Sequence, residues 1–312
     1  MEALKKVLLM FVFVYISSSS IAQQDAMYTH YMYNTLAVNP AYAGSRDALT
    51  ATLLHRSQWT DFKGAPRSQT FTIHTPLNGR HIGLGLSGIN DQAGPAHSSG
   101  VYADFAYIMK LNEKSHLSLG IKGGFTMMQI KLNSLALDDQ SDQAFQNNVT
   151  SELLPNFGFG AYYFRERFYA GISTPKLLEN NFKTNTSTGS VNLASEQRHY
   201  FFIAGTQLKL TDYIEFKPTT FVKITNAAPI QADLTASFIF NQRLLTGGMI
   251  RSGDAMGVLV GITITDQFRV GYSFDWSYGN KTFKYNGGSH ELMLSYDFIF
   301  RDKARIRSPR YF

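Results

Sequence analysis

From about residue 46 onward, the chain consists of short segments in which apolar and polar residues alternate with a period of two. The clearest segment is 290–300. As an extended strand it would have one apolar face, formed by Leu292, Leu294, Tyr296, Phe298 and Phe300. The opposite face would carry Glu291, Met293, Ser295 and Asp297. Repeated behind an export signal, strands with one apolar and one polar face are typical of an outer-membrane β-barrel.

The first 22 residues have the form of a secretory signal peptide. Lys5 and Lys6 precede an apolar run over 7–16, and Ser20-Ile21-Ala22 has the small-x-small form of a cleavage site. The apolar run is too short for a membrane-spanning helix, which needs about 20 residues. We therefore predict cleavage before Gln23. The chain contains no cysteine, so lipid attachment through cysteine, disulfides and Cys-ligated metal sites are excluded.

Counting the alternating segments gives about fourteen strands. The predicted ranges are 46–57, 67–76, 80–90, 98–111, 115–130, 153–164, 167–175, 197–209, 212–224, 229–241, 243–252, 255–264, 267–278 and 288–300. The predicted fold is an all-β, transmembrane, antiparallel outer-membrane β-barrel. Its predicted parts are a signal peptide (1–22), an N-terminal periplasmic or plug segment (23–45), the barrel (46–300) and a periplasmic C-terminal tail (301–312).

The connections between these segments alternate in length. Very short turns, such as 112–114, 165–166 and 241–242, alternate with connections that include two long polar loops at 131–152 and 176–196. Periplasmic turns are short and extracellular loops longer in outer-membrane barrels. An even number of strands then places both ends of the barrel on the periplasmic side. The acidic stretch 138–143 lacks the glutamate of a calcium loop, so we interpret it as solvated loop.

Motifs for catalysis or cofactor binding are weak. The match to G-x-G-x-x-G at 83–88 lies within a predicted strand, whereas a dinucleotide site needs a strand followed by a helix. The eight histidines form no metal-binding spacing, and no serine lies in a nucleophile elbow. We predict no enzyme activity, no cofactor and no metal site. Although the formal net charge is +6, the basic residues are spread along the chain, so nucleic-acid binding is not predicted.

Charged residues are nevertheless expected on the inward face of the barrel. They are Asp104, Lys122, Glu215, Lys217, Asp275 and Asp297. In a barrel, such side chains either line water or pair with one another across a filled lumen.

Three segments carry a more specific signal. They are Asn39-Pro40-Ala41-Tyr42-Ala43-Gly44, the stretch from Arg56 through Trp59 to Gly64-Ala65-Pro66, and the end Ser308-Pro309-Arg310-Tyr311-Phe312. Together they resemble the PorP/SprF family of type IX secretion system membrane proteins, found in Bacteroidota, and the resemblance covers the mature chain. It implies a non-enzymatic outer-membrane component that assists export or surface attachment of a cargo, an adhesin or gliding-motility protein, by binding its C-terminal domain. The implied partners are this cargo, the periplasmic ring and translocon of the secretion machinery, and membrane lipid.

Candidate structural or partner-contact residues come from the same motifs. They are Asn39, Pro40, Tyr42, Gly44, Arg56, Trp59, Arg310, Tyr311 and Phe312. Their alternative role is to close and plug the barrel, and the sequence does not separate the two roles. Asn39-Pro40 favours an extended or turn backbone, and Tyr42 stands among small residues as a possible anchor. Two alternative functions stay open: a porin-like channel for small solutes and a soluble surface adhesin.

Overall fold

The computed structural model describes residues 27–77, 79, 81–134, 148–150, 153–186, 189–226, 228–278 and 287–299. The predicted signal peptide, the acidic stretch 138–143 and the predicted tail 301–312 lie outside these residues. Within the described part of the chain, no helix is long and apolar enough to cross a membrane.

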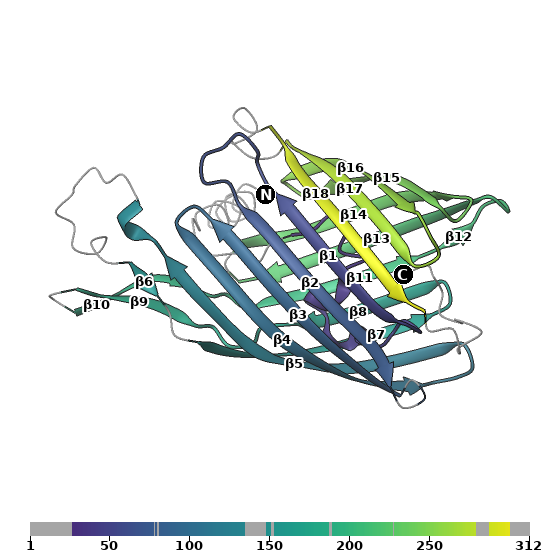
Figure 1. The fold of residues 1–312 in the computed structure, drawn as a ribbon, viewed down its shortest axis with the longest axis horizontal. Coiled ribbons are helices and arrows are strands. Elements are labelled where there is room, and N and C mark those ends of the chain that lie inside the picture. Colours follow the sequence, from purple (N-terminus) through teal and green to yellow (C-terminus); the bar gives the residue numbers. More distant parts are fainter. Residues whose placement is uncertain are drawn as a thin grey trace, which may run out of the picture.

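A closed ring of antiparallel strands forms the body of the protein (Figure 1). Its strands are β1 (Leu49–Ser57), β2 (Arg67–Leu77), β3 (Ile82–Ala93), β4 (Ala96–Lys110), β5 (Ser115–Ile130), β7 (Leu154–Arg165), β8 (Phe168–Thr174), β11 (His199–Thr206), β13 (Ile214–Thr225), β14 (Ala228–Phe240), β15 (Leu244–Arg251), β16 (Ala255–Thr263), β17 (Phe268–Ser277) and β18 (Ser289–Phe298). β1 pairs with β18 and β11 with β13, which closes a 14-stranded barrel. The predicted fold class and strand number are confirmed.

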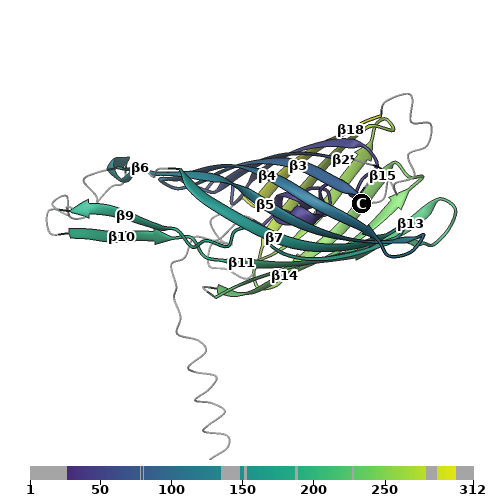
Figure 2. The ribbon, with the colours of Figure 1, turned by 90° about the horizontal axis from the view of Figure 1, so that it is seen from below.

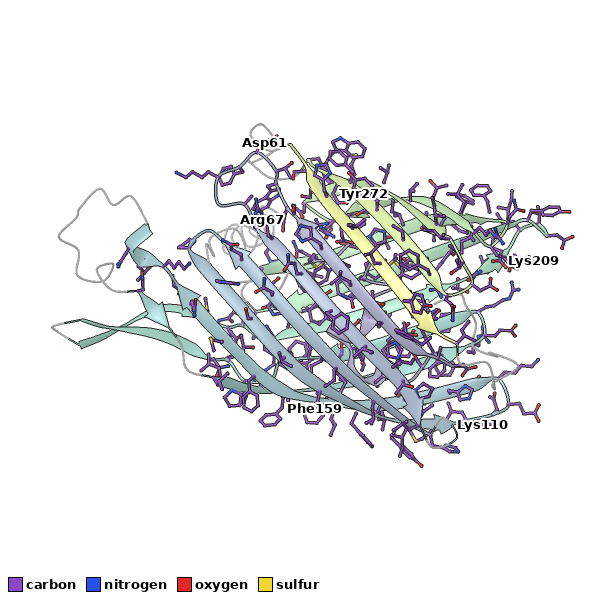
Figure 3. All side chains as sticks on the ribbon, in the orientation of Figure 1. Asp61, Arg67, Lys110, Phe159, Lys209 and Tyr272 are labelled. Atoms are coloured by element: carbon purple, nitrogen blue, oxygen red, sulfur yellow. The ribbon has the colours of Figure 1, made fainter. Side chains whose placement is uncertain are left out.

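In the barrel strands the apolar face is exposed and the polar face is buried, which is the reverse of the arrangement in a soluble protein. In β18, Leu292 is 44% exposed on the outer surface, whereas Glu291 is 1% exposed in the lumen. Figure 3 shows side chains projecting outward from the strands that face the viewer. The apolar face is outermost because lipid, rather than water, surrounds such a barrel. The six predicted inward charges are all buried, which confirms their placement.

The two ends of the barrel carry different turns. The short turns 111–114, 166–167, 241–243 and 264–267 lie at one end, here named the short-turn end. The strand ends at residues 57, 130, 174 and 277 lie at the other end, here named the long-loop end, and these strands are followed by longer connections in the sequence, although the turns 94–95 and 252–254 at this end are short. Two additional short strands pair with ring strands: β6 (Val149–Thr150) with β5, and β12 (Leu208–Lys209) with β13. A 3-10 helix, η3 (Leu132–Ser134), follows β5.

A second, separate sheet projects from the long-loop end. β9 (Asn181–Thr186) and β10 (Gly189–Ser195) form an antiparallel hairpin outside the ring (Figures 1 and 2). The sequence analysis expected only a polar loop over 176–196. The hairpin escaped prediction because its residues are mostly polar, so they lack the apolar alternation that marks the barrel strands.

The N-terminal described residues fill the barrel. Residues 27–46, here named the plug, contain α2 (Thr35–Val38) and η1 (Pro40–Tyr42). They run through the lumen, from contacts near the long-loop ends of β1, β17 and β18 to contacts near the short-turn end of β18. Figure 2 shows this purple segment enclosed by the strands. The lumen is therefore occupied by the protein's own chain.

Candidate functional site

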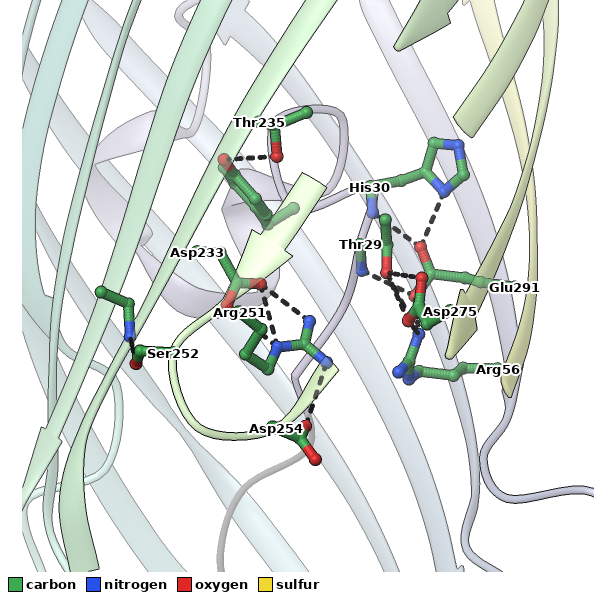
Figure 4. Close-up of polar contacts among 12 residues, drawn as sticks. Thr29, His30, Arg56, Asp233, Thr235, Arg251, Ser252, Asp254, Asp275 and Glu291 are labelled. Carbon is green, nitrogen blue, oxygen red and sulfur yellow. Dashed lines mark hydrogen bonds and ion pairs between the residues drawn. The ribbon is translucent and has the colours of Figure 1, made fainter. Parts of the chain in front are cut away.

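A buried ion cluster holds the beginning of the plug against the wall. Arg56 on β1 places Nη1 2.7 Å from Asp275 Oδ2 and 3.3 Å from Glu291 Oε2. The Thr29 backbone N–H donates to Glu291 Oε2 over 2.8 Å, and the His30 backbone N–H donates to Glu291 Oε1. The Thr29 hydroxyl donates to Asp275 (Figure 4). The Glu291 carboxylate thus binds the plug backbone directly, Asp275 binds the Thr29 side chain, and Arg56 pairs with both carboxylates.

A second group of buried charges joins β14 and β15. Arg251 on β15 makes a bidentate contact with Asp233 on β14, with Nη2–Oδ2 and Nε–Oδ1 distances of 2.7 and 2.9 Å. Its Nη1 also lies 3.6 Å from Asp254 Oδ2 (Figure 4). Paired and hydrogen-bonded in this way, buried charges are tolerated where isolated ones would not be.

The middle of the plug is the Asn-Pro-Ala-Tyr-Ala-Gly motif. The Asn39 side chain accepts a hydrogen bond from the Ala41 backbone N–H over 2.9 Å and donates to the Ala161 carbonyl of β7 over 3.1 Å. Pro40 starts η1, where its missing N–H costs nothing. Tyr42 packs edge-on against His74 and Tyr162, with ring centroids 5.1 and 5.4 Å away. Asn39 and Tyr42 thus both contact β7, at Ala161 and Tyr162, and Tyr42 also contacts His74 on β2.

Glycines in the wall allow the plug backbone to approach closely. A Cβ on Gly83 would lie 2.0 Å from the Ala43 carbonyl oxygen, and a Cβ on Gly120 would lie 2.3 Å from the Ala41 nitrogen. A Cβ on Gly160 would meet Asn39 Oδ1 at 2.1 Å. Gly44 itself has φ +70°, a left-handed conformation that glycine adopts without strain. Gly83 and Gly85 of the 83–88 motif are thus explained by packing against the plug.

Further ion pairs complete the lumen. Arg46, at the end of the plug, contacts Asp297 Oδ2 over 2.9 Å, and Arg269 contacts the same oxygen. Lys122 lies 2.9 Å from Asp104 Oδ1 and also donates to the Leu36 carbonyl of the plug over 3.4 Å. Of the two expectations for the inward charges, these observed pairs match the filled lumen.

The predicted site residues therefore fall into three places. Asn39, Pro40, Tyr42 and Gly44 lie in the plug, and Arg56 lies in the wall cluster that binds it. Trp59 lies in the loop after β1 with φ +49°, and its backbone N–H donates to Ser289 Oγ over 3.2 Å. Arg310, Tyr311 and Phe312 lie outside the described residues. Whether any of them contacts a partner stays a prediction.

Several residues of these buried contacts were not predicted from the sequence. Thr29, His30 and the Asp233–Arg251 pair were not singled out, although Asp233 and Arg251 both lie on inward faces. These two charges were absent from the predicted inward set, and alternation along a strand gives no indication of the partner that a side chain meets. Within the described residues, no group of three or more His, Cys, Asp or Glu side chains is placed to hold a metal ion.

A closed antiparallel ring with an apolar exterior and a polar interior defines an outer-membrane β-barrel. Similar folds occur in a Pseudomonas aeruginosa FadL homologue, with TM-score 0.50, 12% identity and coverage of 84% of this chain and 93% of that one. The CymD monoaromatic hydrocarbon channel is similar with TM-score 0.50, 10% identity and coverage of 86% and 93%. At such identities the likeness shows the fold alone.

The family is established separately. Residues 20–296 match the family described as type IX secretion system membrane protein PorP/SprF. The chain therefore belongs to the PorP/SprF family, and it is an outer-membrane protein of the type IX secretion system. Members of this secretion-system family of membrane barrels are typically non-enzymatic and associate with the secretion machinery. Among curated proteins, none matches the chain by sequence.

Proposed function

We propose that this protein assists the export or surface attachment of a secreted cargo, an adhesin or gliding-motility protein, by binding the cargo's C-terminal domain. The observation that carries the proposal is the plug. It occupies the lumen and is held by buried ion pairs, hydrogen bonds and backbone contacts with wall glycines. A barrel filled in this way acts through its ends, by recognition, and not by passage of solutes.

The long-loop end offers a suitable surface for recognition. The β9–β10 hairpin projects beyond the ring, and within the described residues its two strands pair only with each other. Each strand therefore keeps an outer edge with backbone groups available for another strand. Strand addition at such an edge gives affinity through main-chain hydrogen bonds. We propose that the cargo's C-terminal domain docks on this hairpin.

An affinity pull-down of the tagged protein from detergent-solubilised outer membranes, followed by mass spectrometry, tests this function. We expect recovery of a large secreted protein through its C-terminal domain. A variant with residues 181–195 replaced by a short Gly-Ser turn should lose this cargo and keep the subunits of the secretion machinery. As a control, turn 111–114 at the opposite end is replaced by a Gly-Ser turn of equal length, which should keep the cargo.

Two results would contradict the proposal. One is recovery of the barrel alone, even after mild crosslinking. The other is a set of stable open steps when the purified wild-type protein is inserted in planar bilayers, because we expect a lumen occupied by the plug not to conduct in this way. That second result would move the porin-like channel to first place.

A further inference from the structure

A cavity of about 500 Å³ lies beside the plug at the short-turn end. Tyr33 of the plug lines one side, and inward-facing residues of β13 to β18 line the other. Residues of the turns 241–243 and 265–266 line its outer part, so it is reached from the short-turn end. Cavities of this size hold small organic molecules or the end of a peptide.

Part of this cavity wall is apolar, like the inward positions around Phe201 and Phe221 that pack against the plug. Ile239, Leu245 and Met293 line the cavity at inward positions of β14, β15 and β18. Elsewhere the inward positions are mostly threonine, serine or charged residues. The apolar wall therefore favours a ligand with an apolar body.

Another part of the wall presents buried polar atoms that lack partners. Arg269 is 8% exposed; its Nη2 contacts Asp297, whereas its Nη1 has no hydrogen-bond partner among the described residues. His30 is 1% exposed; its Nδ1 lies 2.7 Å from Glu291, whereas its Nε2 likewise lacks a partner within the described part. Buried polar atoms are normally hydrogen-bonded, so an unpartnered guanidinium nitrogen beside a cavity calls for an acceptor.

The local charge favours an anionic acceptor. Arg46 and Arg269 share the single carboxylate of Asp297, which leaves one positive charge in excess. The one buried carboxylate lining the cavity, Glu215, accepts a hydrogen bond from the Gln207 side chain and lies 4.0 Å from Arg167. Arginine binds carboxylates strongly because its N–H groups make charge-assisted hydrogen bonds.

We propose that this cavity binds a carboxylate carried on an apolar group that enters from the short-turn end. The carboxylate would accept from Arg269 Nη1, and the apolar group would pack on Ile239, Leu245 and Met293. Two sources share this chemistry: a small free acid and the C-terminal residue of a partner peptide. The proposal stands independently of cargo binding at the long-loop end.

Binding is tested by calorimetry with the full-length protein in nanodiscs. The probes are 3-phenylpropionate and an acetylated pentapeptide that ends in phenylalanine, each compared with its uncharged carboxamide. We expect saturable binding of at least one acid and at least about tenfold weaker binding of the matching amide, since the amide loses the charge-assisted contact. Binding of the peptide acid alone would assign a protein partner, and comparable binding of the free acid would assign a small molecule.

Two variants separate the cavity from the stability of the barrel. Gly261 lines the cavity, and a Cβ there would meet only ordinary contacts of 3.6 Å and beyond, so Gly261→Leu should fill the space without breaking an ion pair. Gly248→Leu on the outer face is its control. We expect Gly261→Leu and Arg269→Gln to weaken binding at least about tenfold, and Gly248→Leu to leave binding unchanged.

β18 ends at the short-turn end and residues 301–312 follow it in the sequence, so a variant lacking them is titrated in parallel. Binding seen only in this variant would support the site and assign the tail as its occupant in the full chain. The proposal is overturned if neither acid binds either protein saturably, if amides bind as well as acids, or if folded Gly261→Leu binds like the wild type.

Discussion

The two sides of the lumen wall treat the plug differently. On β3, β5 and β7, the glycines Gly83, Gly120 and Gly160 let the plug backbone lie directly on the wall. On β14, β15 and β18, Ile239, Leu245 and Met293 stand inward and line a cavity beside the plug. At its glycines the first side is in direct contact with the plug backbone, whereas the second side has room for a further group. The comparison teaches that a filled barrel can be sealed along one wall and keep a pocket along the other.

The largest expected effect comes from the ion cluster that fixes the start of the plug. Arg56→Met would leave Asp275 and Glu291 as buried carboxylates without their arginine. We expect a loss of about 3–5 kcal/mol in the free energy of unfolding, because removing one partner leaves buried charge uncompensated. Denaturant unfolding in lipid vesicles measures it. Lys209→Met, which breaks the exposed pair with Asp212, serves as the control and should change stability little.

The sealed side is tested by Gly120→Ala. The added methyl group would overlap the backbone at Ala41, so the plug or the wall must shift. We expect a loss of about 1–3 kcal/mol of stability, together with faster labelling of a cysteine placed at position 43. Gly88→Ala is the matched control, because its nearest neighbouring atom is 4.0 Å from the new Cβ. Equal behaviour of the two variants would argue against close packing of the plug on β5.

A smaller loss is expected for Asn39→Ala. The change removes the acceptor for the Ala41 N–H and the donor to the Ala161 carbonyl, in a fully buried place. Loss of a capping side chain and of its hydrogen bonds should cost about 1–2 kcal/mol. Asn39→Asp keeps the acceptor but not the donor, so its stability, measured in the same denaturation series, shows which bond matters more. An unchanged midpoint for Asn39→Ala would contradict the assigned role.

The smallest effect is expected on the cavity side. Leu245→Phe adds volume next to the cavity, so it should cost less than about 1.5 kcal/mol. Ala41→Val adds two methyl groups on the side where the plug lies directly against Gly120, and it should cost more. Side-by-side unfolding curves decide the order. If Leu245→Phe cost more stability than Ala41→Val, the claim that the plug packs more tightly on the glycine side than on the cavity side would be wrong.

Much of the barrel was predictable because strand identity is local information. A period of two assigns each residue to a face, so Leu292 outside and Glu291 inside followed directly from their order in the chain. Short turns such as 111–114 pair neighbouring strands, which is why the predicted strand ranges agree closely with the observed ones. The mostly polar β9–β10 hairpin had no such apolar signal and was missed.

The sequence by itself determined the export signal prediction, the alternating faces, the number of strands and the family motifs. Only the tertiary structure decided that residues 27–46 fill the lumen and that a cavity is left beside Arg269. It also decided that Glu291 accepts a hydrogen bond from the backbone N–H of His30, which lies 261 positions earlier in the chain. The physical reason is that the two-residue period of a strand determines only whether a side chain faces the lumen or the outer surface. The group it meets there depends on closure of the ring between β1 and β18, which no local pattern encodes.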